Sequence, residues 1–187
     1  NDKRIVPFET INFGSYEQDE LSMQLKLAEP AFNILDIGAN DGWYTVNFAK
    51  RLPESRIYAF EPIPYTYQHL VENINLNGIK NIETYNFGFS DAEGSFDFYF
   101  DSALSGNASL ADVSGVGNDK IVRCAVKKMD DFIDERKIKI DFIKCDVEGA
   151  ELLVFQGGMK AIKENLPIIF SEMLRKWSAK FNYHPND

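Results

Sequence analysis

The chain has few of the residues that mark several common protein classes. It contains two cysteines and two histidines among 187 residues, and no Cys/His cluster has the spacing of a zinc site. Cys124 and Cys145 stand in apolar, strand-like surroundings, which predicts buried free thiols in a reducing compartment. No apolar run reaches the ~18 residues of a membrane span, and residues 1–4 are followed by no signal-peptide core. We therefore expect a cytoplasmic protein without a membrane span.

Positive charge is also scarce. Lysine and arginine number 20 against 29 acidic residues, which gives a formal net charge of -9. This balance argues against nucleic acid or an anionic membrane surface as a partner, because both would be repelled. A neutral or cationic small-molecule substrate fits better, and the oligomeric state is left open.

What the sequence does contain is an alternation of apolar, strand-like runs with helical patterns. This alternation predicts an α/β protein with a mostly parallel, doubly wound sheet. Strands are expected at 33–37, 56–60, 82–86, 140–145 and 168–171. Helices are expected at 42–52, 65–77, 129–136 and 152–164.

The chain divides into two parts by pattern. Residues 1–30 are predicted to be a lead-in with a short strand at 11–13 and a helix at 19–27, and residues 31–187 are predicted to form the main domain. After residue 175 the sequence is polar and without a clear period.

One stretch interrupts the alternation of strands and helices. Residues 95–100 alternate polar and aromatic side chains, and 121–126 are typical of a returning strand. Between them, residues 101–119 are rich in small and polar residues, which predicts a long loop. A long loop in a compact domain is usually functional or mobile.

The most informative segment follows the first predicted strand. Asp36 ends the apolar run, and Gly38 and Gly42 follow with Asn40 between them. Such a turn from strand to helix is where doubly wound sheets bind nucleotide-like ligands, and its amides can accept a carboxylate. The G-x-x-x-G spacing argues against a dinucleotide pyrophosphate, and Asp36 is a candidate partner for an ammonium group. The alternative is a structural turn without a ligand.

A second acid lies at the same predicted sheet edge. Glu61 follows the strand at 56–60, about twenty residues beyond the glycines, the distance at which a carboxylate can bind a ribose diol. Pro62 next to it offers an apolar wall to an adenine. The two segments together indicate an adenosine-containing cofactor, although a solvated strand-end acid is the alternative for Glu61.

Four segments make the pattern specific, namely 35–44, 60–62, 89–91 and 141–151. The last of them reads DFIKCDVEGAE and resembles the DFIK-x-DVEGAE signature of the FkbM family of S-adenosylmethionine-dependent methyltransferases. The resemblance covers residues 30–175. It implies a Rossmann-like class I methyltransferase fold, with S-adenosyl-L-methionine as cofactor and S-adenosyl-L-homocysteine as product.

The resemblance also implies roles for single residues. Gly38, Asn40 and Gly42 would cradle the methionine end of the cofactor, and Glu61 would bind the ribose hydroxyls. Phe89 and Ser90 would border the adenine together with Gly88, and Asp146 would lie near the sulfonium. The family is associated with O-methylation of hydroxyls on sugars, glycans and secondary metabolites, which implies a small-molecule or glycan acceptor.

A hydroxyl is a poor nucleophile, so a residue that takes its proton is expected. His69 is remote by topology and His184 lies in the C-terminal stretch, which leaves Asp146 and Glu148 as the candidate catalytic residues. Glu148 has the alternative of a helix-start acid stabilised by the helix dipole, and Glu151 is expected to be one. No metal requirement is expected, although Asp146 and Glu148 could coordinate Mg²⁺.

The predicted loop supplies candidate acceptor contacts in Asp101, Asn107 and Ser109, unless it is simply solvated. Two further strands of a full methyltransferase sheet are not legible after residue 171, so we expect an exposed sheet edge. Two other functions stay open. One is a non-catalytic cofactor-binding module on this fold, and the other is an NAD-binding oxidoreductase, which the glycine spacing disfavours.

Overall fold

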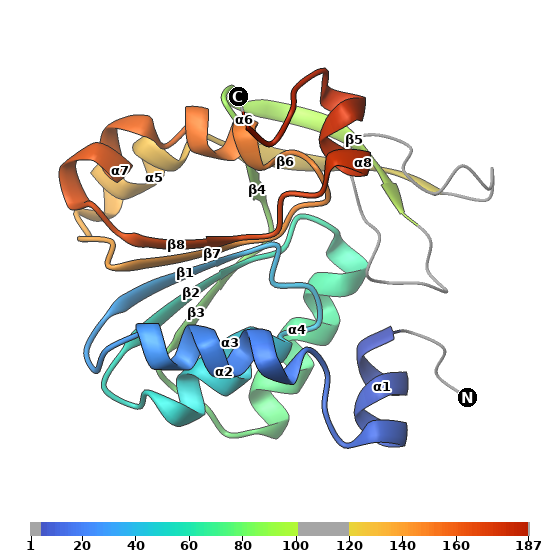
Figure 1. Cartoon of the computed structure of the whole chain (residues 1–187), viewed down its shortest axis with the longest axis vertical. Helices are drawn as coiled ribbons and strands as arrows, with labels where there is room; N and C mark the ends of the chain where they lie inside the picture. Colours follow the sequence, from blue (N-terminus) through green and yellow to red (C-terminus); the bar gives the residue numbers. More distant parts are fainter. Residues whose placement is uncertain (1–4, 101–119, 187) are drawn as a thin grey trace.

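The core of the structure is a parallel sheet with helices on both faces (Figure 1). The computed structural model describes residues 5–100 and 120–186. The strand order is β3-β2-β1-β7-β8, with every pairing parallel. The strands are β1 (Asn33–Ile37), β2 (Arg56–Phe60), β3 (Ile82–Tyr85), β7 (Phe142–Cys145) and β8 (Ile168–Ser171). The predicted doubly wound α/β sheet is confirmed.

Alternation along β1 assigns its side chains to two hydrophobic cores. Leu35 and Ile37 pack in a cluster with residues of the helices on one face, which are α5 (Met129–Arg136), α6 (Glu151–Gln156) and α7 (Met159–Asn165). Ile34 packs in a cluster with α2 (Gln18–Leu27) and α3 (Trp43–Arg51) on the other face, which α4 (Pro64–Leu76) also covers. Asp36 shares this second face and is fully buried.

A second, smaller sheet stands beside the main one. It has the order β4-β6-β5, with β4 (Gly88–Phe89) parallel and β5 (Gly94–Phe100) antiparallel to β6 (Lys120–Lys127). The predicted strands at 95–100 and 121–126 are therefore confirmed. Gly88 and Phe89 form a strand of their own in this sheet, where the sequence pattern predicted no strand between residues 86 and 95.

The N-terminal segment departs from the prediction. Residues Ile5–Phe13 form helix α1, so the predicted strand at 11–13 is wrong. The alternation of Ile11, Asn12 and Phe13 resembles a strand, but a lone strand leaves its backbone groups unpaired, whereas a helix pairs them locally. Thr10 accepts the closing bond of this helix from the amide of Gly14, at 3.0 Å.

The predicted helix at 152–164 is two helices, α6 and α7, separated by Gly157 and Gly158. A Cβ at position 157 would lie 2.0 Å from the carbonyl oxygen of Ser90. Close packing against Ser90 therefore requires glycine there, and glycine weakens a helix interior.

The stretch after residue 175 is more ordered than its sequence suggests. It forms α8 (Arg175–Ser178) and a 3₁₀ turn, η1 (Ala179–Phe181). Cys124 and Cys145 are buried free thiols, as predicted. Within residues 5–100 and 120–186, no helix has the length and apolar character needed to cross a membrane.

Candidate functional site

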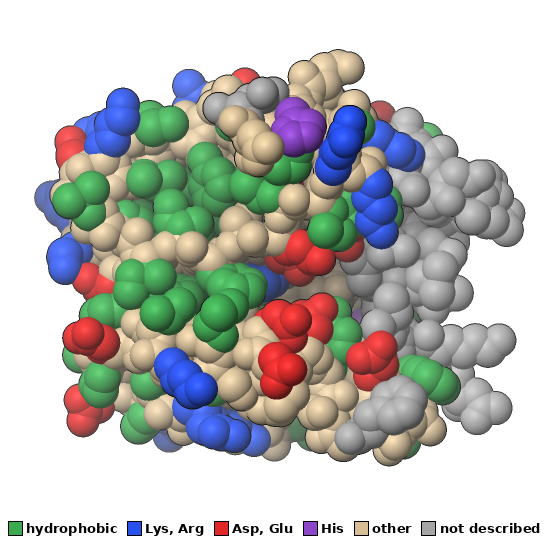
Figure 2. Space-filling view, in the orientation of Figure 1, with side chains coloured by type: hydrophobic (Ala, Val, Ile, Leu, Met, Phe, Trp, Pro, Cys, Tyr) green, Lys and Arg blue, Asp and Glu red, His purple; other side chains and the backbone are tan. Residues whose placement is uncertain are grey.

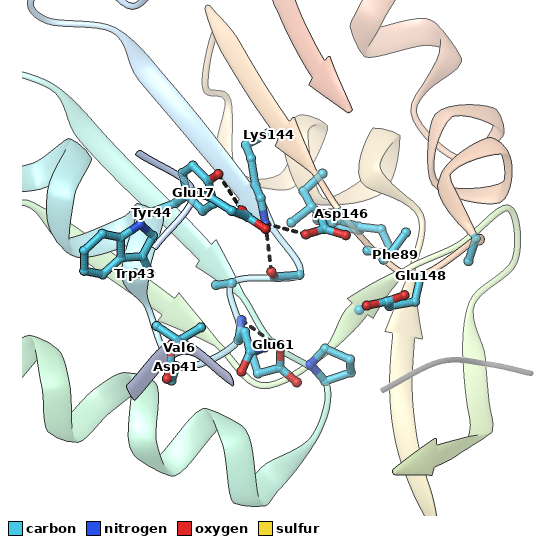
Figure 3. Close-up of a pocket in the computed structure, with 18 of the residues that line it drawn as sticks. Val6, Glu17, Asp41, Trp43, Tyr44, Glu61, Phe89, Lys144, Asp146 and Glu148 are labelled. Atoms are coloured by element: carbon cyan, nitrogen blue, oxygen red, sulfur yellow. Dashed lines mark hydrogen bonds and ion pairs between the residues drawn. The ribbon is translucent and has the colours of Figure 1, made fainter. Parts of the chain in front are cut away.

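Three neighbouring strands end side by side and place three predicted residues together. Ile37 at the end of β1 pairs with Phe60 of β2 and with Cys145 of β7. The residues that directly follow β1, β2 and β7 are Gly38, Glu61 and Asp146, respectively. All three line one cavity, which we call the first cavity (Figure 3). This is the edge at which open α/β sheets bind their ligands.

The turn after β1 fits against β7 only because residue 38 is glycine. Gly38 has φ of 77°, and a Cβ there would lie 1.9 Å from the carbonyl oxygen of Asp146. Its amide and that of Ala39 donate to the carbonyl of Phe60 at 3.0 and 2.9 Å. These contacts hold the turn at the junction of β1, β2 and β7.

Glu61 is a buried carboxylate at the end of β2, with 5% of its surface exposed. Its oxygens accept hydrogen bonds from the amides of Asn40 and Ile63, at 3.0 and 2.9 Å. Burial raises the pKa of Glu61 to about 7 despite these two bonds, which favour the charged form. The group therefore changes charge near neutral pH.

Two buried polar atoms in the lining of the first cavity lack a partner among the described residues. They are Oδ1 of Asn40 and Nε1 of Trp43. A buried acceptor and donor without partners cost free energy, and a polar ligand in the cavity would satisfy them. The lining therefore fits a polar cofactor.

Lys144 on β7 lies between the carboxylates of this edge, and sequence reasoning missed it. Its Nζ donates to the carbonyl of Gly38 at 3.1 Å and lies 3.5 Å from Oδ1 of Asp36 and 3.6 Å from Oδ2 of Asp146. Burial alone would lower the pKa of Lys144, but the carboxylates of Asp36 and Asp146 outweigh it and hold that pKa above its ordinary value. A lysine inside a strand as apolar as Phe142–Cys145 was the available signal, because buried lysines are rare unless paired.

Asp36 holds Lys144 from the interior of the sheet. It is fully buried and outside the cavity lining, and its Oδ2 accepts a 2.5 Å hydrogen bond from Thr45 Oγ1 on α3. Since Asp36 and Lys144 are register partners on adjacent strands, the pair links β1, β7 and α3.

Glu148 and Glu151 follow β7 and have different surroundings. Glu148 lines the first cavity with a φ of 55°, a conformation that costs energy for a residue with a side chain. Burial, with Asp146 and Glu172 as further causes, raises its pKa to about 8. Glu151 is fully buried and accepts hydrogen bonds from the amides of Val147 and Gly149, both at 3.1 Å. Glu151 thus holds the turn on which Glu148 stands, as a helix-start acid would.

The C-terminal stretch reinforces the same turn. The hydroxyl of Tyr183 lies 2.8 Å from the carbonyl oxygen of Gly149 and 3.1 Å from Oε2 of Glu151. A residue far along the chain therefore helps to fix the backbone beside Glu148.

A second cavity adjoins the first at the C-terminal ends of β7 and β8. Its acidic lining consists of Glu17, Glu20, Asp146 and Glu172, and Figure 2 shows acidic side chains gathered around a hollow midway across this face. Lys144 and Asp146 line both cavities. Among the described lining residues of the two cavities, Lys144 is the one lysine or arginine.

The N-terminal segment also contributes to the site, which its sequence did not indicate. Val6, Tyr16 and Glu17 line the first cavity. Oε2 of Glu17 accepts a 2.7 Å hydrogen bond from the Tyr44 hydroxyl on α3. Tyr16 packs edge-on against Trp43, with ring centroids 6.3 Å apart.

The structure brings most of the predicted site residues to the first cavity and leaves three outside its lining. The predicted residues in the lining are Gly38, Asn40, Glu61, Pro62, Phe89, Asp146 and Glu148. Asp36, Gly42 and Ser90 are not part of it, and Ser90 Oγ instead bonds Asp91 at 3.1 Å.

Two further predictions concern contacts to the acceptor and metal binding. The candidate acceptor contacts Asp101, Asn107 and Ser109 lie outside the described residues. Within the described ranges, no three His, Cys, Asp or Glu side chains are grouped to hold a metal ion, and the absence of a metal requirement stays a prediction.

Comparison with known proteins identifies the relatives of this chain. The family model of the methyltransferase FkbM domain matches residues 36–186, which confirms the resemblance indicated by segment 141–151. The 2-O-methyltransferase NoeI of Sinorhizobium fredii is 30% identical over 151 residues, which cover 73% of this chain and 61% of NoeI. The hexuronic acid methyltransferase AglP of Haloferax volcanii is 25% identical over 148 residues, which cover 79% of this chain and 58% of AglP. The chain thus spans about 60% of the length of these relatives.

A solved structure shares the fold. Precorrin 8w decarboxylase from Methanobacterium thermoautotrophicum superposes with a TM-score of 0.50 at 18% identity, over 90% of this chain and 69% of that one. The likeness shows a Rossmann-like α/β fold, in agreement with the parallel sheet and its two helical layers.

Proposed function

Because the chain belongs to the FkbM methyltransferase family, we propose that it transfers a methyl group from S-adenosylmethionine to a hydroxyl of a sugar, glycan or secondary metabolite. The observation that carries the proposal is the Glu61 carboxylate, buried at the end of β2 and facing the same cavity as the Gly38 turn. The names of NoeI and AglP support a hydroxyl or sugar acceptor.

The first cavity offers a partner for each part of the cofactor. Asn40, with its unpartnered Oδ1, and the turn at Gly38 would hold the methionine end. Glu61 would accept hydrogen bonds from the ribose hydroxyls. Pro62 and Phe89 supply apolar walls for the adenine.

When bound, S-adenosylmethionine supplies an activated methyl group, so the protein mainly has to align the acceptor oxygen, exclude water and take up its proton. Asp146 lines both cavities and would orient the acceptor hydroxyl. Glu148 would take the hydroxyl proton, because a base whose pKa is about 8 is matched to neutral pH.

The second cavity is the proposed entry for the acceptor, because it adjoins the first at Asp146. Its carboxylates would repel an anionic molecule. We therefore expect the accepting hydroxyl to belong to an uncharged or cationic molecule, unlike the hexuronic acid in the name of AglP.

The first test is a comparison of two ligands by calorimetry. We expect S-adenosylhomocysteine to bind the wild-type chain and NAD to show no binding, because the G-x-x-x-G turn lacks the middle glycine for a pyrophosphate. Comparable affinities for the two ligands would contradict the proposal and favour an oxidoreductase. Binding of S-adenosylhomocysteine without transfer to any hydroxyl acceptor would favour a non-catalytic module.

Replacement of Glu61 tests the residue that carries the proposal. Glu61→Gln should weaken S-adenosylhomocysteine binding by about 1–3 kcal/mol, the cost of losing a charged acceptor. In the wild type, affinity should rise as pH rises through about 7, the pKa of Glu61, because the charged form accepts the ribose hydrogen bonds. The variant should lose this dependence.

The control for this experiment is Glu54→Gln, at an exposed acid just before β2. It should leave both the affinity and its pH profile unchanged. Equal affinities for Glu61→Gln and Glu54→Gln would show that Glu61 does not contact the cofactor.

A further inference from the structure

We propose that Lys144 is a positioning residue whose fixed positive charge sets the preference of the site between the charged methyl donor and its neutral product. The proposal rests on the proposed function, because it concerns the cofactor of that reaction. It adds a role for a residue that neither the signature nor the cavity lining explains by itself.

The position of Lys144 is determined on every side. Its ammonium bonds the carbonyl of Gly38 and pairs with Asp36 and Asp146, and it lies 5.1 Å from the centre of the Tyr44 ring. Figure 3 shows the side chain between Tyr44 and Asp146. Its own exposed fraction is 4%, so its pair with the fully buried Asp36 is shielded from water, and charge interactions are strong in such surroundings.

The charge of Lys144 is permanent at neutral pH. The pairing with Asp36 and Asp146 holds its pKa above the ordinary lysine value, so it cannot serve as a base. With two carboxylates and one ammonium, this group of three carries one formal negative charge.

A fixed cation affects the two forms of the cofactor differently. The donor carries a sulfonium charge that the product lacks, and both share the same amino acid and adenosine groups. Lys144 in the cavity wall therefore disfavours the donor relative to the product. Because the positive charge is lost during transfer, Lys144 lowers the barrier by raising the charged ground state.

The test is a charge series measured by calorimetry with S-adenosylmethionine and S-adenosylhomocysteine at one fixed, mildly alkaline pH. Asp36→Asn removes one negative charge, Lys144→Met removes the positive charge, and the double variant removes both. The preference for the charged ligand should be weakest in Asp36→Asn, intermediate in the wild type and the double variant, and strongest in Lys144→Met. Each step should change the affinity ratio by roughly an order of magnitude, the effect expected of one unit charge in a partly shielded site.

The same calorimetric affinities also test whether Lys144 positions the Gly38 turn. Lys144→Met and the double variant should both bind S-adenosylhomocysteine more weakly than the wild type, because the bond to the Gly38 carbonyl is lost. Lys144→Arg keeps the charge and should restore the affinity ratio. The matched control is Lys139→Met, which removes an exposed lysine paired with Asp141 just before β7 and should change neither quantity.

An affinity ratio that stays constant across the series would overturn the proposal, as would a shift of opposite sign. If Lys144→Met does not fold, Asp36→Asn and the double variant still differ by one charge and decide the question. A wild-type chain that binds neither ligand would instead remove the proposed function, so the two failures are distinguishable.

Discussion

Glu148→Gln should lower the single-turnover rate of methyl transfer by ~10²–10⁴-fold, the usual contribution of a general base, while S-adenosylhomocysteine affinity stays near the wild-type value. Glutamine is nearly isosteric with glutamate, so it keeps the shape of the turn that Glu151 and Tyr183 hold. The measurement pairs the rate, for an uncharged hydroxyl acceptor found with methyl-labelled S-adenosylmethionine, with cofactor affinity by calorimetry.

The pH profile separates a base from a structural acid. A base acts when deprotonated, so the wild-type rate should rise as pH rises through about 8, the pKa of Glu148, and the variant should lose this rise.

Asp146→Asn should impair both affinity and rate, because Asp146 lines both cavities. The control is Glu164→Gln at an exposed acid near the end of α7. A wild-type rate in Glu148→Gln would leave Glu148 as a helix-start acid only.

Stability should respond to Glu148 in the opposite sense from activity. Its folded-state pKa lies above the unfolded value, so the wild type should lose stability as pH rises from about 4.5 through about 8. Glutamine carries no titrating proton, so urea unfolding of Glu148→Gln should show a smaller loss over this range, while Glu61, whose pKa is also raised, still contributes to it. A less active variant that is equally or more stable at alkaline pH would indicate a group retained for function.

Among substitutions that add one methyl group at the site, Gly38→Ala should be the most destabilising. The new Cβ would lie 1.9 Å from the Asp146 carbonyl oxygen, which belongs to the backbone and can move only with the end of β7. Overpacking costs about 1–3 kcal/mol and a left-handed conformation with a side chain about 1–2 kcal/mol. The free energy of unfolding in urea should therefore fall by roughly 2–5 kcal/mol, with loss of S-adenosylhomocysteine binding.

Gly78→Ala is the matched control for this effect. Gly78 also has a positive φ, of 64°, but no atom lies within 4 Å of its added Cβ. It should show only the conformational cost of about 1–2 kcal/mol and leave ligand affinity unchanged. Equal destabilisation by the two variants would mean that the contact between Gly38 and Asp146 is not close in solution.

Local pattern was sufficient for the central elements of the fold. The bounds of β1, β2, β8 and α5 are those that the sequence predicts. β1 and β2 read as near-continuous apolar runs because both of their faces are covered. The residues directly after such runs must meet at one sheet edge, which is why Gly38, Glu61 and Asp146 could be placed together.

The sequence failed where an element depends on a distant partner. The break between α6 and α7 follows from packing of Gly157 on Ser90, and β4 exists because Gly88 and Phe89 pair with β6. Neither contact leaves a periodic pattern near its own position in the chain.

The sequence by itself determined the family, the doubly wound sheet and the acids at its edge, because apolar strand runs and turn chemistry are encoded in local residue types. The tertiary structure alone decided which of those acids lie close together and which group lies between them. Lys144, Asp36 and Asp146 act as one group because two strands are in register. Glu17, which lines both cavities, is bonded to Tyr44 from a segment far along the chain. Burial and charge interactions depend on distances in space, which spacing along the chain does not encode.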